Sequence, residues 1–260
     1  MVKRKAHKRF AIGKCENRNE QFENIHYWVQ QYKIWGAPII SIDTKKKEDL
    51  GNLYRDGKLY VRRGQQLKRW DHDFSYLSEG KIIPHGIYDL CNNSAFINIG
   101  TSKDTSEFAC ESIRYWWNLR GRYDWRHADY LLILADCGGS NSARSHLFKQ
   151  ELQQLADSID LQIRVAHFPP YCSKWNYIEH RVFPHITRTL QGVVFESHQV
   201  FKTMAEKTKT RTGLKVKANI LSKSYETKRK VSAQYRQEQP IFFDQNLPQW
   251  NYLACPRRYW

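Results

Sequence analysis

The chain has 260 residues, of which 41% are hydrophobic and 26% are charged. This composition excludes a disordered chain and predicts one large domain with a substantial buried core. Lys and Arg number 42 against 26 Asp and Glu, a net charge of +16 that indicates a polyanionic partner. Nucleic acid is the leading candidate, because basic surface releases counterions from phosphates, although ribosomal-type and membrane-surface proteins can be equally basic.

The cysteines and the start of the chain exclude several other classes. Six cysteines are scattered without a CxxC pair, which argues against a zinc finger and against a small disulfide scaffold. The start "MVKRKAHKRFAIGKCENRNE" is basic but lacks an apolar signal core, and no apolar run approaches the length of a membrane span. We therefore expect a soluble cytoplasmic protein that associates with DNA and has no membrane partner.

Hydrophobic patterns predict eight elements in the order strand, strand, strand, helix, strand, helix, strand, helix. In chain order these are strands at 37–44, 81–90 and 94–101, a helix from Thr105, a strand at 131–136, a helix from Ala143 to about Asp157, a strand at 161–170 and a helix from Ser173. Residues 51–80 read as a hairpin or long insertion, and the double tryptophan at 116–117 reads as core. This order suits a mixed sheet with helices on both faces.

Three acidic residues stand where such a fold places ligands. Asp43 ends the first strand, Asp136 ends the fourth, and Glu179 lies on the helix after the fifth. If the first and fourth strands are neighbours, the two aspartates converge at the carboxyl edge of the sheet and the glutamate reaches over them. Such hard oxygen ligands suit two Mg²⁺ or Mn²⁺ ions, which neutralise carboxylates that otherwise repel one another. The alternative for Asp136 is a turn residue that only satisfies backbone N–H groups.

The blocks "SIDTKKKE", "LILADCGGSN" and "SKWNYIEHRVF" resemble the signature blocks of bacterial insertion-sequence transposases of the DDE class, of the ISAzo type and distantly mariner-like. The similarity extends from about residue 35 to about residue 250. It implies an α/β, RNase H-like domain with a mixed five-stranded sheet flanked by helices. It also implies a DDE transposase that cleaves DNA at transposon ends and joins them to target DNA, with two Mg²⁺ or Mn²⁺ ions bound by Asp43, Asp136 and Glu179.

Further residues are candidates for supporting roles. On a continuous helix, Asn176, His180 and Phe183 share a face with Glu179, so Asn176 and His180 could orient the glutamate or contact DNA. A surface or helix-packing histidine is the alternative for His180. The predicted DNA contacts are Lys45, Lys46, Lys47, Lys174, Trp175, Lys209, Arg211, Lys215 and Lys217. For the three consecutive lysines an ordinary exposed hairpin is the alternative, for Trp175 ordinary packing, and for the basic segment 201–236 a solvated face.

The resemblance divides the chain at residues 37 and 200. Residues 1–36 are expected to be a basic remnant of a longer N-terminal region, since family members carry a helix-turn-helix there. Residues 37–200 form the expected catalytic domain, and 201–260 a basic C-terminal extension. Tyr177 and Cys137 replace the usual proline and glycine, which leaves the carboxylates intact. DNA and, from the resemblance alone, a homodimer on DNA are the expected partners. The alternatives are a non-enzymatic DNA-binding remnant and an RNase H-type nuclease.

Overall fold

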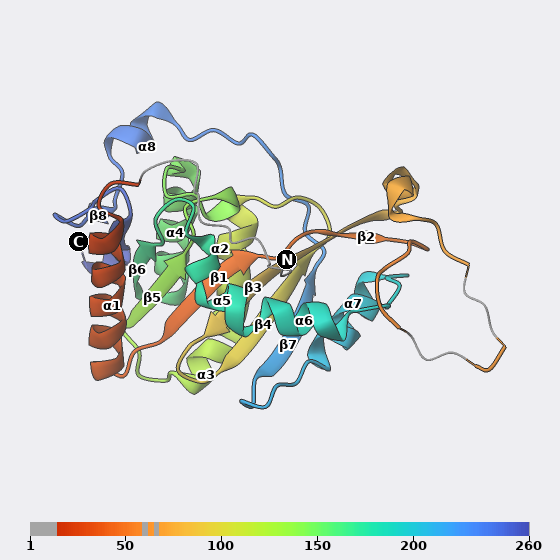
Figure 1. Ribbon diagram of the computed structural model, residues 1–260. Coiled ribbons are helices and arrows are strands. Elements are labelled where there is room, and N and C mark those ends of the chain that lie inside the picture. Colours follow the sequence, from red (N-terminus) through yellow and green to blue (C-terminus); the bar gives the residue numbers. More distant parts are fainter. Residues whose placement is uncertain (1–14, 59–61, 65–67, 260) are drawn as a thin grey trace, which may run out of the picture.

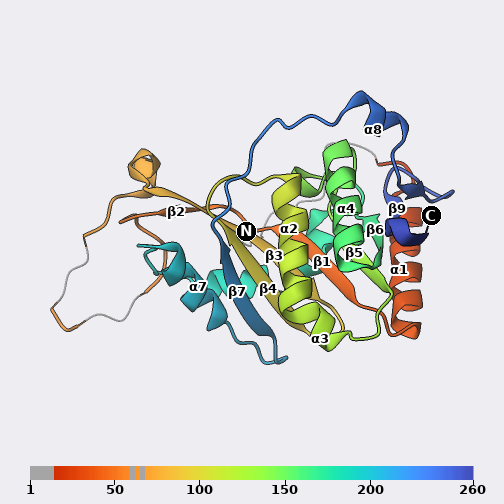
Figure 2. The ribbon, with the colours of Figure 1, turned by 180° about the vertical axis from the view of Figure 1, so that it is seen from behind.

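A mixed β-sheet runs through the molecule, with helices on both of its faces (Figures 1 and 2). The computed structural model describes residues 15–58, 62–64 and 68–259, and in this part of the chain nine strands form the sheet. They follow the order β7-β4-β3-β1-β5-β6-β9-β8, with β2 paired to β3 off this path. The strands are β1 (Ile39–Thr44), β2 (Glu48–Leu50), β3 (Gly80–Asp89), β4 (Ser94–Gly100), β5 (Tyr130–Ala135), β6 (Gln162–His167), β7 (Lys215–Leu221), β8 (Phe242–Phe243) and β9 (Asn251–Ala254).

The central five strands confirm the RNase H-like arrangement. β1, β3 and β4 form an antiparallel meander, while β5 and β6 run parallel to β1. The first and fourth predicted strands, β1 and β5, are direct neighbours, as the convergence of the two aspartates requires. The sheet is larger than the five strands expected, because β7 joins one edge and β9 and β8 join the other.

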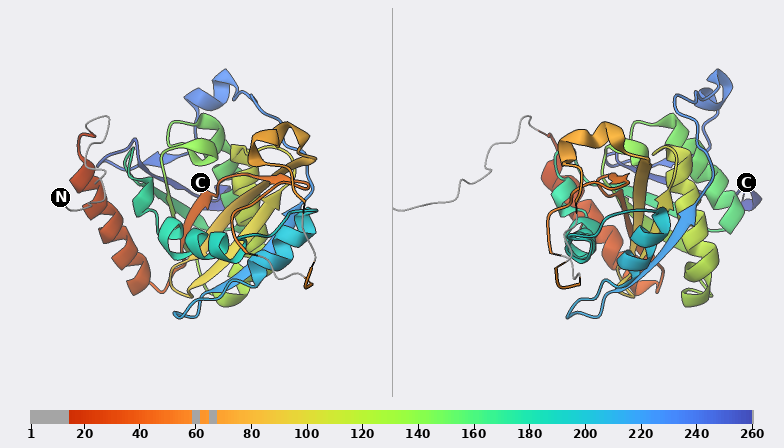
Figure 3. Two further views of the ribbon diagram at one scale, coloured as in Figure 1. Left: turned by 45° about the vertical axis from the view of Figure 1, so that its right-hand side comes forward. Right: turned by 90° about the vertical axis from the view of Figure 1, so that its right-hand side faces the viewer.

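Helices cover each face because the side chains of a strand alternate between faces. The helices are α1 (Arg18–Ile34), α2 (Ser106–Trp116), α3 (Arg122–Asp124), α4 (His146–Ile159), α5 (Tyr177–Arg181), α6 (Phe183–Thr189), α7 (His198–Glu206) and α8 (Ala233–Gln237). They lie on both sides of the sheet (Figure 3). Ile40 and Ile42 of β1 pack with α2 and α4, whereas Ile39 packs with α1, so the core has two sides. Among the described residues, no helix is long and apolar enough to cross a bilayer.

A local signal predicted the start of α2. The Thr105 hydroxyl accepts a hydrogen bond from Phe108 N at 3.2 Å and caps α2, whose start was predicted at Thr105. Trp116 and Trp117 are buried, which confirms them as core. The helix predicted from Ala143 begins later, at His146, because residues 139–141 form a 3₁₀ turn and Ser145 provides the cap.

The predicted insertion is an arm that leaves the sheet after β2 and returns at β3 (Figure 1). A 3₁₀ helix at His72–Leu77 and a bridge between Leu53 and Trp70 are its regular parts among the described residues. Residues 59–61 and 65–67 lie outside the described residues.

Residues at both ends of the chain belong to the same layers as the predicted catalytic domain. α1 packs on β5 and β1, while residues 1–14 of the expected N-terminal segment lie outside the described residues. The segment 201–260 supplies most of α7 and all of β7, β8 and β9. Strands of one sheet therefore lie on both sides of residue 200 in the chain. The prediction of a basic extension missed the buried strand positions of this segment, such as Val216 and Ala218, because basic residues dominate it.

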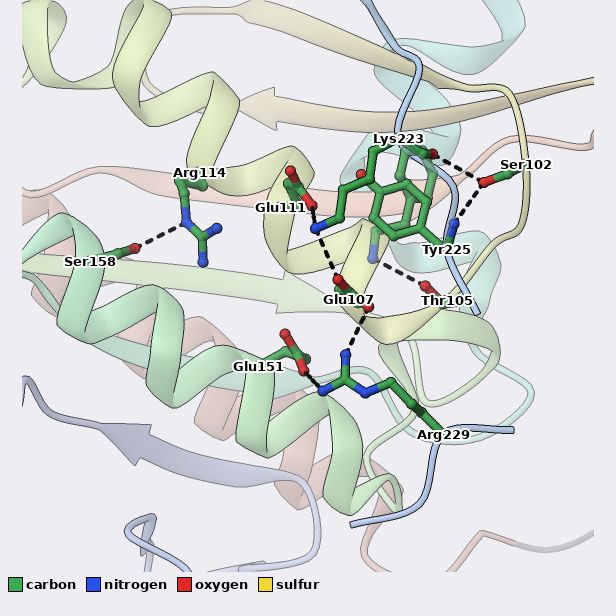
Figure 4. A network of polar contacts seen from close by, with 11 residues as sticks. Ser102, Thr105, Glu107, Glu111, Arg114, Glu151, Ser158, Lys223, Tyr225 and Arg229 are labelled. Carbon is green, nitrogen blue, oxygen red and sulfur yellow. Dashed lines mark hydrogen bonds and ion pairs between the residues drawn. The ribbon is translucent and has the colours of Figure 1, made fainter. Parts of the chain in front are cut away.

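Residues 222–232 connect β7 at one edge of the sheet to α8 near the other and pass over α2 and α4 (Figure 2). Ion pairs hold this connection (Figure 4): Lys223 binds Glu107 at 2.9 Å and Glu111 at 2.8 Å. Arg229 binds Glu107 at 2.7 Å and Glu151 at 2.6 Å. Only 7% of the Glu151 side chain is exposed, so Arg229 neutralises a nearly buried carboxylate.

We expect Arg229→Ala to lower the free energy of unfolding by about 1–2 kcal/mol, because the buried Glu151 charge loses its partner while solvent screens part of the loss. Urea unfolding followed by circular dichroism measures the change. The matched control is Arg120→Ala, which breaks the exposed pair with Asp124 and should cost less than about 0.5 kcal/mol. Equal losses in the two variants would mean that the connection is not held by Arg229.

Candidate active site

The two strand-end aspartates stand side by side. Ile42 of β1 pairs with Ala135 of β5 in parallel register, so the residues that follow them, Asp43 and Asp136, lie at the same edge of the sheet. Alternation along β1 places Asp43 on the face of Ile39, opposite Ile42. Both aspartates are partly buried, and each carboxylate receives a backbone N–H: Thr44 N at 2.7 Å for Asp43 and Gly138 N at 3.3 Å for Asp136.

Glu179 reaches this edge from α5, and Asn176 holds α5 in place. The Ser41 hydroxyl donates to Asn176 Oδ1 at 2.5 Å, and Asn176 Nδ2 donates to the carbonyl oxygen of Ile42 at 2.9 Å. Ile178 N donates to Ser41 Oγ at 3.0 Å. The start of α5 is thereby fixed to β1 at the residues directly before Asp43.

The predicted continuous helix is wrong and is replaced by two short helices. Asn176 is the residue before α5 and has extended backbone angles, so it does not share a helix face with Glu179. The helix breaks at Val182, and α6 follows with Pro184 in its first turn, since proline lacks the N–H of an interior helical residue. Asn176 is buried and His180 is exposed, which leaves His180 away from the β1 contacts.

The three carboxylates influence one another strongly. Burial, followed by the charges of Asp136 and Glu179, raises the pKa of Asp43 to about 8. Burial also raises the pKa of Asp136, to which the charges of Glu179 and Asp104 add. A site that resists ionisation in this way gains free energy when cations are present.

His167 holds the backbone of Asp136 in place. Its Nδ1 lies 2.8 Å from the carbonyl oxygen of Asp136, which only accepts, so Nδ1 carries the proton. Its Nε2 then accepts from the Tyr252 hydroxyl at 2.8 Å. Gln21 of α1 donates to the His167 carbonyl oxygen at 2.8 Å, so β9 and α1 both brace the strand beside the aspartate.

Asp104 is an acidic residue of this edge that the sequence did not single out for the site. It follows β4 and accepts a hydrogen bond from the Thr44 hydroxyl at 3.3 Å, while Lys47 lies 3.7 Å from its other oxygen. The available signal was its position after the third predicted strand, which lies two strands from β1 in the meander.

The donor set fits hard divalent cations, because its ligands are partly buried carboxylate oxygens that have no ion-pair partner among the described residues. In the described part of the chain, no three His, Cys, Asp or Glu side chains surround one point closely enough to hold a single ion together.

The predicted DNA-binding lysines occupy different environments. Lys45 is only 8% exposed and pairs with Glu48 at 2.6 Å, so it is part of the protein's own packing. Lys46 is exposed and Lys47 half-exposed. Lys174 is exposed and lies 5.4 Å from the ring centre of Trp175, itself 49% exposed and in edge contact with Phe22.

The predicted DNA contacts of the C-terminal part lie on β7 and in the segment before it. Through the ladder of β7, β4, β3 and β1, Lys215 is level with Ile40 and Lys217 with Ile42, the residue before Asp43. Lys209 and Arg211 lie between α7 and β7. Lys217 is exposed and three strand spacings of about 4.8 Å from β1.

These features define the chain as an RNase H-like domain with a carboxylate cluster at the carboxyl edge of β1 and β5. The family described as Rhodopirellula transposase DDE domain matches residues 2–256. The chain belongs to this family.

A search of curated proteins finds no match to this chain. Among solved structures, the Mos1 transposase paired-end complex with left transposon end is 15% identical with a TM-score of 0.49, covering 78% of this chain and 58% of that one. The Mos1 mariner paired-end complex with Mn is 16% identical with a TM-score of 0.45 over the same shares. The Mos1 strand transfer complex is 14% identical with a TM-score of 0.46, over 78% and 57%. The chain thus spans less than two thirds of each of these solved chains.

We expect Asn176→Ala to lower the free energy of unfolding by about 1–3 kcal/mol, because the buried carbonyl oxygen of Ile42 and the Ser41 hydroxyl lose a partner. Chemical unfolding measures the loss. His180→Ala on the same helix is the control and should stay within about 0.5 kcal/mol, since its side chain is exposed. A larger loss from His180→Ala would contradict the anchoring of α5 through Asn176.

We expect Asp43→Asn to stabilise the metal-free protein, increasingly so from about pH 4 to about pH 8. The folded-state pKa of Asp43 is raised to about 8, so its favourable contribution is full below the unfolded pKa and is lost as the pH rises through 8. Unfolding in chelator at acidic and alkaline pH measures the difference. The control is Asp129→Asn, an exposed acid at the opposite end of β5, which should show no such trend. Equal stability of Asp43→Asn and the parent protein above pH 8 would contradict the buried repulsion.

Proposed function

We propose that the chain is a transposase catalytic domain that cleaves phosphodiesters at transposon ends and transfers the resulting 3′-hydroxyls to target DNA. The observation that carries this proposal is the meeting of carboxylates from β1, β5 and α5 at one partly buried edge, where burial and then the neighbouring charges raise the pKa of Asp43. Membership in the transposase DDE domain family supports the same activity.

In this proposal Asp43, Asp136 and Glu179 are the catalytic carboxylates and hold two Mg²⁺ or Mn²⁺ ions. Two bound ions supply activation of the attacking oxygen and stabilisation of the leaving oxygen in phosphodiester cleavage. The protein supplies position: His167 fixes the backbone of Asp136, and Asn176 fixes the start of α5. Because these supports are buried and hydrogen-bonded, the carboxylates need little reorganisation when charge develops.

The proposed partners are the DNA of the transposon ends and of the target, with two copies of the chain acting on paired ends. The positive net charge supports binding to DNA. Lys46, Lys174 and Trp175 are predicted contacts with exposed side chains, and each lies within five residues of a proposed carboxylate along the chain. Their contribution to binding, and that of Lys209 to Lys217, is part of this proposal.

The test is nicking of supercoiled plasmid by the purified chain in Mn²⁺, in Mg²⁺ and with chelator. We expect metal-dependent nicking that falls to background in Asp136→Asn and Glu179→Gln, because each change removes a ligand charge and keeps the side-chain shape. Asp129→Asn is the matched control, since it makes the same change on the same strand segment but at the other end, and it should nick normally.

Near-normal nicking by Asp136→Asn would contradict the proposal. Absence of nicking in the parent chain with DNA binding intact would favour a DNA-binding remnant without chemistry. Cleavage of the RNA strand of an RNA–DNA hybrid without any strand transfer would favour an RNase H-type nuclease.

A further inference from the structure

A cleft of about 910 Å³ opens beside Glu179 and extends away from the carboxylates. One wall is the chain from Lys45 to Asp56, which leads into the arm, and the other is α6 with Phe183, Thr187 and Arg188. Its volume lies in the range of ligand-sized pockets, roughly 300–1,000 Å³.

Hydrogen bonds join the two segments that form the walls of the cleft. Gly51 N donates to the carbonyl oxygen of Phe195 at 2.9 Å, and Gly192 N donates to that of Asp56 at 2.9 Å, so the arm is tied to the chain after α6. The Arg55 guanidinium lies 4.1 Å from the ring centre of Phe195. A Cβ on Gly57 would stand 2.5 Å from Gly192 N, so only glycine permits this approach of the two segments.

Most charges on the walls are neutralised within the protein. Glu48 pairs with Lys45 and with Arg55, each at 2.6 Å, and Asp49 pairs with Lys81. Lys46 and Arg188 are exposed and line the cleft, and neither has an ion-pair partner among the described residues. Of the acids that line the cleft, Asp56 and Glu179 have no ion-pair partner among the described residues, and Glu179 is one of the proposed metal ligands. Lys46 and Arg188 are the two lining cations without an acidic partner in that part of the chain, and such cations are suited to an incoming anion.

We propose that this cleft binds the phosphodiester backbone of the DNA strand that leaves the carboxylates on the Glu179 side, with Lys46 and Arg188 contacting its phosphates. The proposal rests on the proposed function, because that function places a scissile phosphate next to Glu179. It adds Arg188 as a contact that the sequence did not indicate and gives Lys45 a different role, since Lys45 shapes the wall through Glu48. Phosphate contacts of this kind position the strand without reading its sequence.

The test is binding of a fluorescein-labelled DNA duplex by fluorescence anisotropy over a series of salt concentrations, in chelator so that no cleavage occurs. We expect the double variant Lys46→Gln/Arg188→Gln to bind more weakly and its log–log salt slope to shrink by about 2, since each phosphate contact contributes about 0.9. The matched control is Lys33→Gln/Arg126→Gln, which removes the same charge from exposed positions near the opposite end of β1 and β5 and should keep the parent slope.

A third variant separates shape from charge. Thr187→Trp fills the cleft from an exposed position of α6 without changing the net charge, and we expect it to weaken binding as well. Circular dichroism of each variant verifies that the fold is intact.

Equal salt slopes for the two double variants would contradict the proposal that the cleft binds DNA, and so would unchanged binding by Thr187→Trp. The plasmid assay keeps this outcome apart from failure of the proposed function. Metal-dependent nicking by the parent chain, with unchanged DNA affinity in the cleft variants, would contradict DNA binding in the cleft and support the proposed function. Weakened binding in the cleft variants, with no nicking by the parent chain, would support DNA binding in the cleft and contradict the proposed function.

Discussion

The parallel pairing of β1 with β5 is the constraint on which the proposed active site depends. The register that opposes Ile42 and Ala135 sets Asp43 and Asp136 next to each other where the strands end. A slip of one residue would move the side chains of a strand to the opposite face of the sheet. Burial on both faces of β1 and β5 prevents such a slip, because each slip would expose isoleucine and leucine side chains that now pack against α1, α2 and α4.

Burying acids next to one another costs free energy, and polar contacts hold the arrangement in place against that cost. Ser41 and Asn176 fix α5 to β1, and His167 with Tyr252 fixes the turn at Asp136. These residues are buried and contribute no charge, so they brace the acids without neutralising them. Buried carboxylates that repel one another, and whose repulsion cations relieve, are a common compromise between stability and activity.

The path of the chain explains why segments of basic composition are structural. β7 and β9 lie at opposite sides of the five central strands, so the chain between them has to cross one face of the sheet. It passes over α2 and α4, where ion pairs of Lys223 and Arg229 hold it (Figure 4). Several of the basic residues after position 200 therefore have acidic partners in the protein itself. Lys46 and Arg188, which have no ion-pair partner among the described residues, stand instead in the cleft beside Glu179, where we propose that they contact DNA.

Local pattern in the sequence was sufficient for the central strands, the capped start of α2, the buried tryptophan pair and the placement of the acids at strand ends, because apolar periodicity and capping act over a few residues. Tertiary structure alone decided that Asn176 stands outside its helix and binds β1, that Lys45 is paired and buried, and that Lys215 and Lys217 lie on β7, three strands from β1. It also brought Asp104 and Arg188 to the site. Each of these depends on partners distant in the chain, for example 134 residues between Ile42 and Asn176, and no local pattern encodes which distant strand or helix becomes the neighbour.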